Sequence, residues 1–328
     1  MSQDVGLAIV YQELIGEYLE RRADVEANLG LEFWLTQWNL APSILIGTAL
    51  VVGLYLYAVG PLREKYHLAG SVKRGQVITF LVGVLIIFLA LASPLDELGD
   101  EYLFSAHMVQ HLLITLVGPP LLLLGMPGWL IRPLLRNRGV FLIARGLTFP
   151  VVAFVLYNAD FWLWHAPPLY DATLSNESIH ILEHLTFIVF SIIAWWPIFS
   201  PVEELPRLSI GGQILYLFFN CMPAVLLGAG LTFFPPLYAP YVQQPVRAWG
   251  LSPVTDQQLG GLIMWVPGNI LYIGIMSVLL IRWLQMQEQK QRASEAAMDA
   301  QLVQSEEDED DDDMNEQEDV PHEQVSQG

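Results

Sequence analysis

Cysteine is almost absent from this chain of 328 residues, in which Cys221 is the only one. A single cysteine excludes an internal disulfide framework. Charged residues are also scarce: they make up 15% of the chain, whereas soluble globular domains carry about 25%. The sequence has no P-loop, no dinucleotide-binding fingerprint and no basic patch, so no nucleic acid partner is expected. The N-terminus lacks the cationic stretch of a cleaved signal peptide.

The sequence contains long apolar runs. Hydrophobic residues account for 53% of the chain, and the mean hydropathy is +0.42. A helix needs roughly 20 apolar residues to cross about 30 Å of hydrocarbon, and none of the runs alternates as a barrel strand would. The sequence therefore predicts an all-α polytopic membrane protein, a seven-transmembrane-helix bundle in a lipid bilayer. The spans are expected near 42–60, 76–92, 102–126, 149–166, 179–199, 212–234 and 260–284.

The lysines and arginines predict the orientation of the bundle. Most of them lie after the first, third, fifth and seventh spans, and few lie in the other loops. Because basic loops stay on the cytoplasmic side, we expect the N-terminus outside and the C-terminus in the cytoplasm. The residues that carry this prediction are Arg63, Lys65, Lys73, Arg74, Arg132, Arg136, Arg138, Arg145, Arg207, Arg282, Lys290 and Arg292.

Three regions follow from this topology. Residues 1–41 form an extracytoplasmic N-terminal segment, in which 5–29 have the pattern of an amphipathic surface helix. Residues 42–284 form the seven-helix membrane domain. Residues 285–328 contain the acidic run EEDEDDDD and supply most of the net charge of −19. Such a segment repels itself and buries no core, so it is predicted to be a disordered cytoplasmic tail.

Five of the seven histidines are expected at one depth in the membrane. His107 and His111 open the third span, His165 closes the fourth, and His180 and His184 open the fifth. With the topology above, all five lie in the outer leaflet. Each pair with i, i+4 spacing shares one helical face. A lone intramembrane histidine is often only a hydrogen-bonded contact between helices, but five at a common depth predict a shared metal or polar site.

Polar neighbours of the histidines are candidates for a second shell around such a site. Glu183 lies between the two histidines of the fifth span, Asp160 precedes His165 by five residues, and Gln110 adjoins His111. Outer-shell groups of this kind orient imidazoles or carry protons, and Glu183 could also ligate a metal itself. The loop before the third span is acidic, and its carboxylates are either a cation-concentrating entrance or an ordinary solvated loop. They are Asp96, Glu97, Asp100 and Glu101.

Three stretches resemble a known family. They are SPLDELGDEYLFSAHMVQHLLITLVGPPLLLLGMP, DFWLWHAPPLYDATLSNESIHILEHLTFIVFSIIAWWP and DQQLGGLIMWVPG. These blocks resemble the CtaG-type cytochrome c oxidase assembly proteins, first linked to caa-type oxidases. The resemblance implies a multi-pass protein of the bacterial cell (inner) membrane. It also implies a role in the maturation of a haem–copper oxidase, with oxidase subunits as partners and copper as the metal supplied or inserted.

Residues and resemblance together predict an assembly factor, not an enzyme, whose outer-leaflet cluster binds copper transiently. The ligands expected are His107, His111, His165, His180 and His184. Two alternatives stay open. One is an intramembrane zinc hydrolase in which three histidines hold the metal and Glu183 or Asp160 is the base. The other is a haem protein with His111 and His184 as axial ligands.

Overall fold

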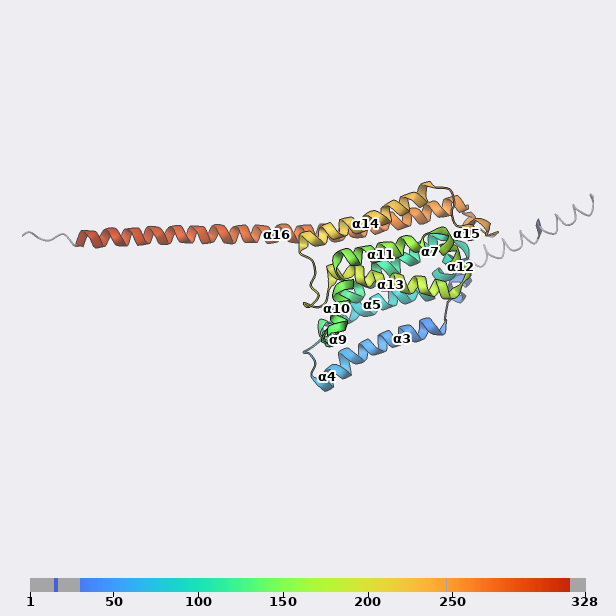
Figure 1. Cartoon of the computed structure of the whole chain (residues 1–328), viewed down its shortest axis with the longest axis horizontal. Coiled ribbons are helices and arrows are strands. Elements are labelled where there is room, and N and C mark those ends of the chain that lie inside the picture. The colour runs from blue at the N-terminus through green and yellow to red at the C-terminus, as the bar shows by residue number, and fades with distance from the viewer. Residues whose placement is uncertain (1–14, 17–29, 246, 319–328) are drawn as a thin grey trace, which may run out of the picture. The chain divides into compact units, whose positions relative to one another are not determined.

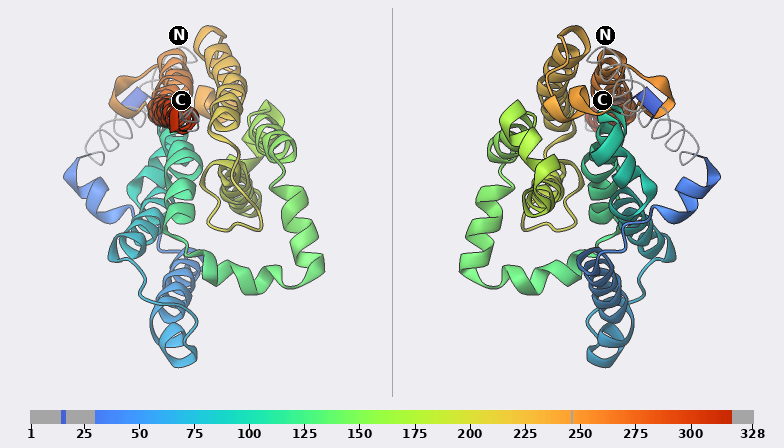
Figure 2. Two further views of the ribbon diagram at one scale, coloured as in Figure 1. Left: turned by 90° about the vertical axis from the view of Figure 1, so that its left-hand side faces the viewer. Right: turned by 90° about the vertical axis from the view of Figure 1, so that its right-hand side faces the viewer.

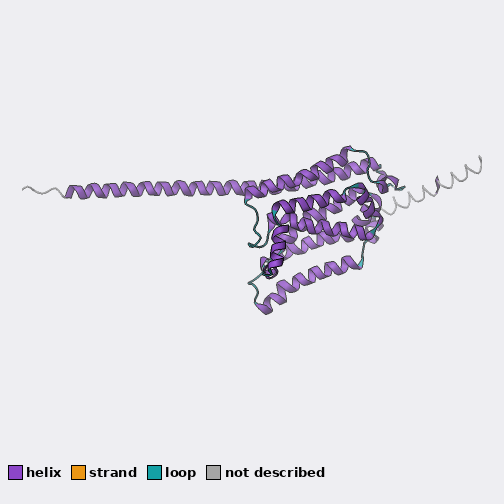
Figure 3. Cartoon of the chain, in the orientation of Figure 1, coloured by secondary structure: helices purple, strands orange, loops and turns teal. Residues whose placement is uncertain are grey.

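The computed structural model describes residues 15–16, 30–245 and 247–318, and every regular element in these ranges is a helix (Figures 1 and 3). This confirms the predicted all-α class. The chain divides into two compact units, Met1–Met276 and Ser277–Gly328. The first unit holds the helical bundle and all five of the histidines predicted to converge.

Six helices in the described ranges are long and apolar enough to cross a membrane, and a seventh span results if one bent pair is counted with them. The number of spans is therefore six or seven, where the sequence predicts seven. The spans run along Pro42–Tyr66, Arg74–Ala92, Phe104–Gly125, Glu177–Phe199, Ile210–Phe233 and Pro253–Gln301. They correspond to α3 (Pro42–Tyr57) with η1 (Ala58–Leu62) and α4 (Arg63–Tyr66), α5 (Arg74–Ala92), α7 (Phe104–Leu112) with η3 (Leu113–Val117) and α8 (Gly118–Gly125), α13 (Glu177–Phe199), α14 (Ile210–Phe233) and part of α16 (Pro253–Glu318).

The bent pair is the predicted fourth span. Helix α11 (Pro150–Trp164) has 15 residues and covers about 22 Å at 1.5 Å per residue, short of the hydrocarbon core. It follows α10 (Arg138–Leu147) at an angle of 67°. Pro150 at the start of α11 has no N–H with which to continue α10, so the chain turns there. Figure 2, which looks along the bundle, shows α9 (Gly128–Leu135) and α10 lying across its end.

The third span is broken by two prolines, and a partner helix repairs the break. In a continuous α-helix the carbonyl of Thr115 would accept a bond from the N–H of residue 119, which is proline. The indole of Trp195 on α13 donates to that carbonyl instead, at 3.0 Å. The backbone widens there into the π-helical turn η3, which begins two residues after His111. Turns of this kind inside α-helices are frequent at functional sites.

The N-terminus of α7 is capped by a residue from the last span. Leu103 has no side chain that can accept the first free N–H groups of α7. Asp256 of α16 does so: its carboxylate accepts from the Phe104 N–H at 2.8 Å and from the Ser105 N–H at 3.0 Å. Capping of these groups stabilises a helix by about 1 kcal/mol. The contact also ties α16 to the helix that carries the first two histidines.

Short helices close the end of the bundle where α7 and α13 begin. They are α2 (Leu31–Thr36), α6 (Pro94–Glu97), η2 (Leu98–Tyr102), α12 (Pro167–Ser175), α15 (Ala239–Gln243) and η4 (Ala248–Gly250). Helices α4, α9 and α10 lie at the other end (Figure 1). The arginines of the predicted cytoplasmic loops therefore lie at the end opposite to the one that α12 and α15 close.

The second unit contains the end of α16, and the disorder expected for residues 285–328 stays a prediction. Helix α16 continues to Glu318, and its side chains are exposed from residue 287 to residue 301. Glutamine, alanine and glutamate dominate this stretch, and all three favour helix. Arg292 pairs with Glu288 one turn earlier. Residues 319–328 lie outside the described residues, as does the predicted surface helix at 5–29 apart from residues 15–16.

Candidate metal centre

Four imidazoles from two helices meet at one place. On α7 the Nε2 atoms of His107 and His111 are 2.7 Å apart, and on α13 those of His180 and His184 are 3.2 Å apart. Across the helices the ring centroids of His107 and His180 are separated by 5.6 Å, and those of His111 and His184 also by 5.6 Å. The structure thus brings these four histidines together, and the ring of the fifth, His165, lies 5.9 Å from that of His111, centroid to centroid.

The carboxyl group of Glu183 lies between these imidazoles and belongs to the same cluster. Its side chain is 0% exposed. One carboxylate oxygen lies 3.7 Å from His111 Nε2 and the other 4.0 Å from His107 Nε2. One donor atom from each of His107, His111, Glu183 and His184 lies within 4.8 Å of all the others. Neither oxygen of Glu183 accepts a hydrogen bond of ordinary geometry from the described residues. The sequence leaves open whether Glu183 ligates or acts from an outer shell, and in the structure its carboxylate lies among the imidazoles.

Asp100 orients two of the histidines. Its two carboxylate oxygens lie 3.3 Å from His107 Nδ1 and 3.2 Å from His180 Nδ1. A proton held on each Nδ1 leaves each Nε2 free as a ligand, which is the usual arrangement of metal-binding histidines. Burial alone would raise the pKa of Asp100, but the contacts with His107 and His180 outweigh burial and lower it.

The role of Asp100 is absent from the sequence-based prediction, which treats it as one of four entrance carboxylates. The π-helical turn η2 folds this loop back over the start of α7. Gly99 makes the fold possible: a Cβ added there would lie 3.0 Å from the Cα of His107. The adjacent Gly-Asp pair was the available signal, but nothing in the sequence shows that the loop turns back.

Gln110 and Asp160, two of the predicted second-shell residues, form their hydrogen bonds elsewhere. The Gln110 amide donates to the Ala90 carbonyl at 3.0 Å and to Asp96 at 2.6 Å. Asp160 accepts from the Trp164 indole at 3.0 Å. Burial, followed by the nearby charge of Asp100, raises the pKa of Asp96 to about 6. The Gln110 contacts join α7 to α5 and α6, the Asp160 contact lies within α11, and neither residue orients an imidazole.

Aromatic side chains cover the cluster. The Tyr170 ring lies 5.3 Å from the ring of His107, centroid to centroid. Its hydroxyl meets that of Tyr241 at 3.1 Å, and the Tyr241 hydroxyl is 2.6 Å from the Gly99 carbonyl. Tyr238 donates to the His165 carbonyl at 3.1 Å. All three tyrosines are buried, and Tyr170 covers His107 at this end, whereas His180 stays partly exposed.

This donor set fits a transition metal. Neutral imidazole is a ligand for copper, zinc and iron, and a carboxylate can complete a four-coordinate site. The Nε2 atoms already face one another at distances that place them around one centre. A buried carboxylate without a hydrogen-bond donor is costly unless a cation compensates it. His107, His111, His184 and Glu183 would hold the metal, with Asp100 and His180 beside them.

Fold and cluster define a class: a multi-pass helical membrane protein with a buried histidine–glutamate cluster near one end of its bundle. The family model described as "Cytochrome c oxidase caa3 assembly factor (Caa3_CtaG)" matches residues 53–286, which is more than half of the chain. The chain belongs to this family of cytochrome c oxidase assembly factors. The matched range contains the whole cluster, and the resemblance recognised in the sequence is confirmed.

Curated relatives come from mycobacteria. The chain is 28% identical over 267 residues to "Uncharacterized protein Mb0105" of Mycobacterium bovis and to "Uncharacterized protein MT0111" of Mycobacterium tuberculosis. It is 24% identical to "Uncharacterized protein ML1998" of Mycobacterium leprae. Each alignment covers 76% of this chain and 40% of the relative. The chain therefore matches less than half of the length of these relatives. No solved structure gives a significant match.

Proposed function

We propose that this assembly factor binds copper at His107, His111, His184 and Glu183 and passes it to a haem–copper oxidase. The chain is a carrier in this proposal and catalyses no reaction. The observation that carries the proposal is Glu183: its carboxyl group is fully buried, accepts no hydrogen bond of ordinary geometry from the described residues, and faces the Nε2 atoms of His107 and His111. A metal cation between these groups would satisfy all of them at once.

Copper is assigned because the family matures an oxidase that needs it, and three imidazoles with one carboxylate are a donor set that copper accepts. A ligand set without cysteine thiolate favours release, which a carrier requires. Haem is disfavoured by the geometry. Donor atoms of His107 and Glu183 lie within 4.8 Å of those of His111 and His184, and a porphyrin plane between the latter two would collide with them.

Deletion of the gene tests the proposal. We expect oxidase polypeptides to be made at normal levels but to have low activity and low copper content, with partial rescue by copper added to the medium. Wild-type protein supplied from a plasmid should restore both quantities. Purified oxidase with normal copper content and normal activity from the deletion strain would contradict the proposal. If the purified protein retains zinc and hydrolyses a lipid or an amide, the alternative of an intramembrane zinc hydrolase would replace the proposal of a copper carrier.

We also propose that the cluster faces the outer side of the membrane, with the N-terminus outside. The basic loops support this orientation through the positive-inside rule. Reporter fusions that end at Asn137, before α10, and at Asn176, before α13, should read out the cytoplasm and the outside respectively. Two fusions that report the same side would contradict the orientation.

A further inference from the structure

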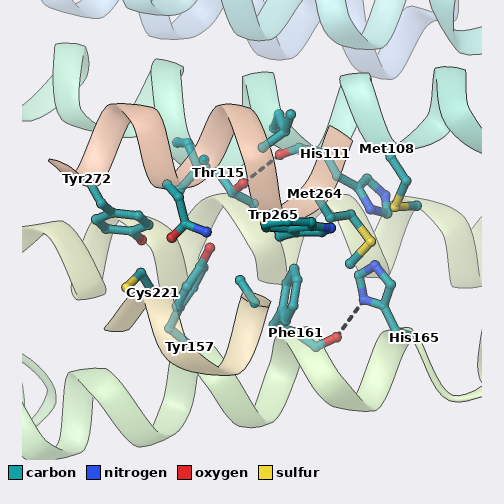
Figure 4. A pocket seen from close by; sticks show the side chains of 15 residues that line it. Met108, His111, Thr115, Tyr157, Phe161, His165, Cys221, Met264, Trp265 and Tyr272 are labelled. Atoms are coloured by element: carbon teal, nitrogen blue, oxygen red, sulfur yellow. Dashed lines mark hydrogen bonds between the residues drawn. The ribbon is translucent and has the colours of Figure 1, made fainter. Parts of the chain in front are cut away.

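A small cavity adjoins the histidine–glutamate cluster on its membrane side. Its volume is about 30 Å³, enough for one water molecule or one ion. Met108, His111, His165 and Met264 gather at one end of the cavity, and Cys221 and Tyr272 line the other (Figure 4). The fifth histidine of the sequence prediction, His165, therefore belongs to this cavity, and it is not in the four-residue group that contains Glu183.

The orientation of His165 prepares it as a ligand. Its Nδ1 atom lies 2.7 Å from the carbonyl oxygen of Phe161. A carbonyl only accepts, so Nδ1 carries the proton and Nε2 has its lone pair free. The side chain is 4% exposed, and Nε2 has no hydrogen-bond partner among the described residues. Metal-binding histidines commonly hold their second nitrogen against a backbone carbonyl in this way.

The two methionines bring thioether sulfur to the same place from different helices. Met108 belongs to α7 and Met264 to α16, and both are buried. In Figure 4 the sulfur of Met264 points toward the ring of His165, and the sulfur of Met108 lies beside the ring of His111. Gly260 allows α16 to approach α7 here, since an added Cβ would lie 2.3 Å from Phe104 Cδ1.

We infer that His165, Met108 and Met264 form a second metal site, selective for a soft monovalent ion such as Cu(I). Thioether ligands select Cu(I) over harder cations, and imidazole is compatible with it. Packing alone explains a methionine in an apolar helix, but it does not explain an unpartnered imidazole nitrogen beside the thioether of Met264. The site shares no residue with the His107–Glu183 group, so it stands or falls separately from the proposed function.

His111 links the two sites. It lines the cavity and also belongs to the group that contains Glu183. Cu(I) can pass between the two sites by exchange of ligands at His111, without a change in oxidation state. The soft site would then hold Cu(I) deeper in the bundle than the imidazole–carboxylate site.

The test uses the full chain purified in detergent and loaded with Cu(I) without oxygen. We expect two copper ions per chain and sulfur among the ligands in the X-ray absorption spectrum. Changing Met108 and Met264 together to leucine should leave one ion with only nitrogen and oxygen ligands. These swaps nearly conserve volume, so the bundle should remain folded. Met222→Leu is the matched control, because Met222 is 43% exposed and does not line the cavity.

Other variants separate this inference from the proposed function. Glu183→Gln should weaken the imidazole–carboxylate site and leave copper–sulfur scattering intact. The inference is overturned if wild-type protein shows no sulfur ligand, or if the signal survives in the double methionine variant. It is also overturned if sulfur scattering is lost in Cys221→Ser, because the thiol would then be the source. Normal oxidase maturation in the deletion strain would contradict only the proposed function.

Discussion

Replacing His111 by leucine should abolish tight copper binding and oxidase maturation while the protein accumulates to its normal level. Leucine keeps the bulk of the side chain and removes a polar group that is costly within a membrane span, so insertion and packing should not suffer. The loss follows from the position of His111, whose Nε2 lies 2.7 Å from that of His107 and 3.7 Å from Glu183. Loss of an outer-shell partner costs about 10–100-fold in metal affinity, and loss of a direct ligand should cost more.

His184→Leu should behave in the same way, and the double variant should be little worse than either single one because both residues act on one centre. Metal analysis of the purified protein and oxidase activity in membranes are the two measurements. His67→Asn is the control: His67 is exposed in a loop with a φ of 47°, which asparagine tolerates. If His111→Leu binds copper and supports the oxidase as wild type does, His111 is only a packed polar contact.

Glu183→Gln should move metal affinity and stability in opposite directions. The substitution keeps the shape of the side chain and replaces a buried carboxyl group whose oxygens accept no hydrogen bond of ordinary geometry from the described residues. Copper affinity should fall at least 10-fold, by comparison with the loss of an outer-shell partner. The metal-free protein should melt about 2–4 °C higher in detergent, which corresponds to ~1 kcal/mol for a domain of this size.

Glu177→Gln on the same helix is the matched control, because Glu177 is exposed and its change should alter neither quantity. A thermal scan of metal-free protein and a copper titration measure the two effects. A Glu183→Gln variant that loses both affinity and stability would indicate that Glu183 has a structural partner, and one that loses neither would remove it from the cluster.

The sequence was informative about the histidines because depth in a membrane can be counted along a helix. The third and fifth spans enter from one end of the bundle, so i, i+4 pairs near their starts must meet if the helices pack together. Helices α7 and α13 do so, and their four imidazoles lie side by side. Counting along a helix does not describe how a loop folds back, and Asp100 lies in such a loop.

Rotation about the helix axis was harder to predict than depth. His165 has nearly the depth of the others, yet the hydrogen bond from its Nδ1 to Phe161 turns it toward Met264. Gln110 lies next to His111 but faces Asp96 across the adjoining loop. The fourth span expected at 149–166 begins where α11 does, but an apolar run gives no sign of the preceding helix α10 or of the 67° angle between the two.

The cap that Asp256 places on α7 affects the order in which the bundle is completed during synthesis. Phe104 and Asp256 are 152 residues apart, and a ribosome adding about 5–20 residues per second needs about 8–30 s to cover that distance. Through this interval His107 and His111 are already made, but the helix that carries them lacks the acceptor for its first N–H groups. The last span also carries Gly260 and Met264, which α7 packs against. The end of the bundle that holds the histidine–glutamate cluster is therefore completed only after the last span has begun to be made, and under the proposed function copper would load after that point.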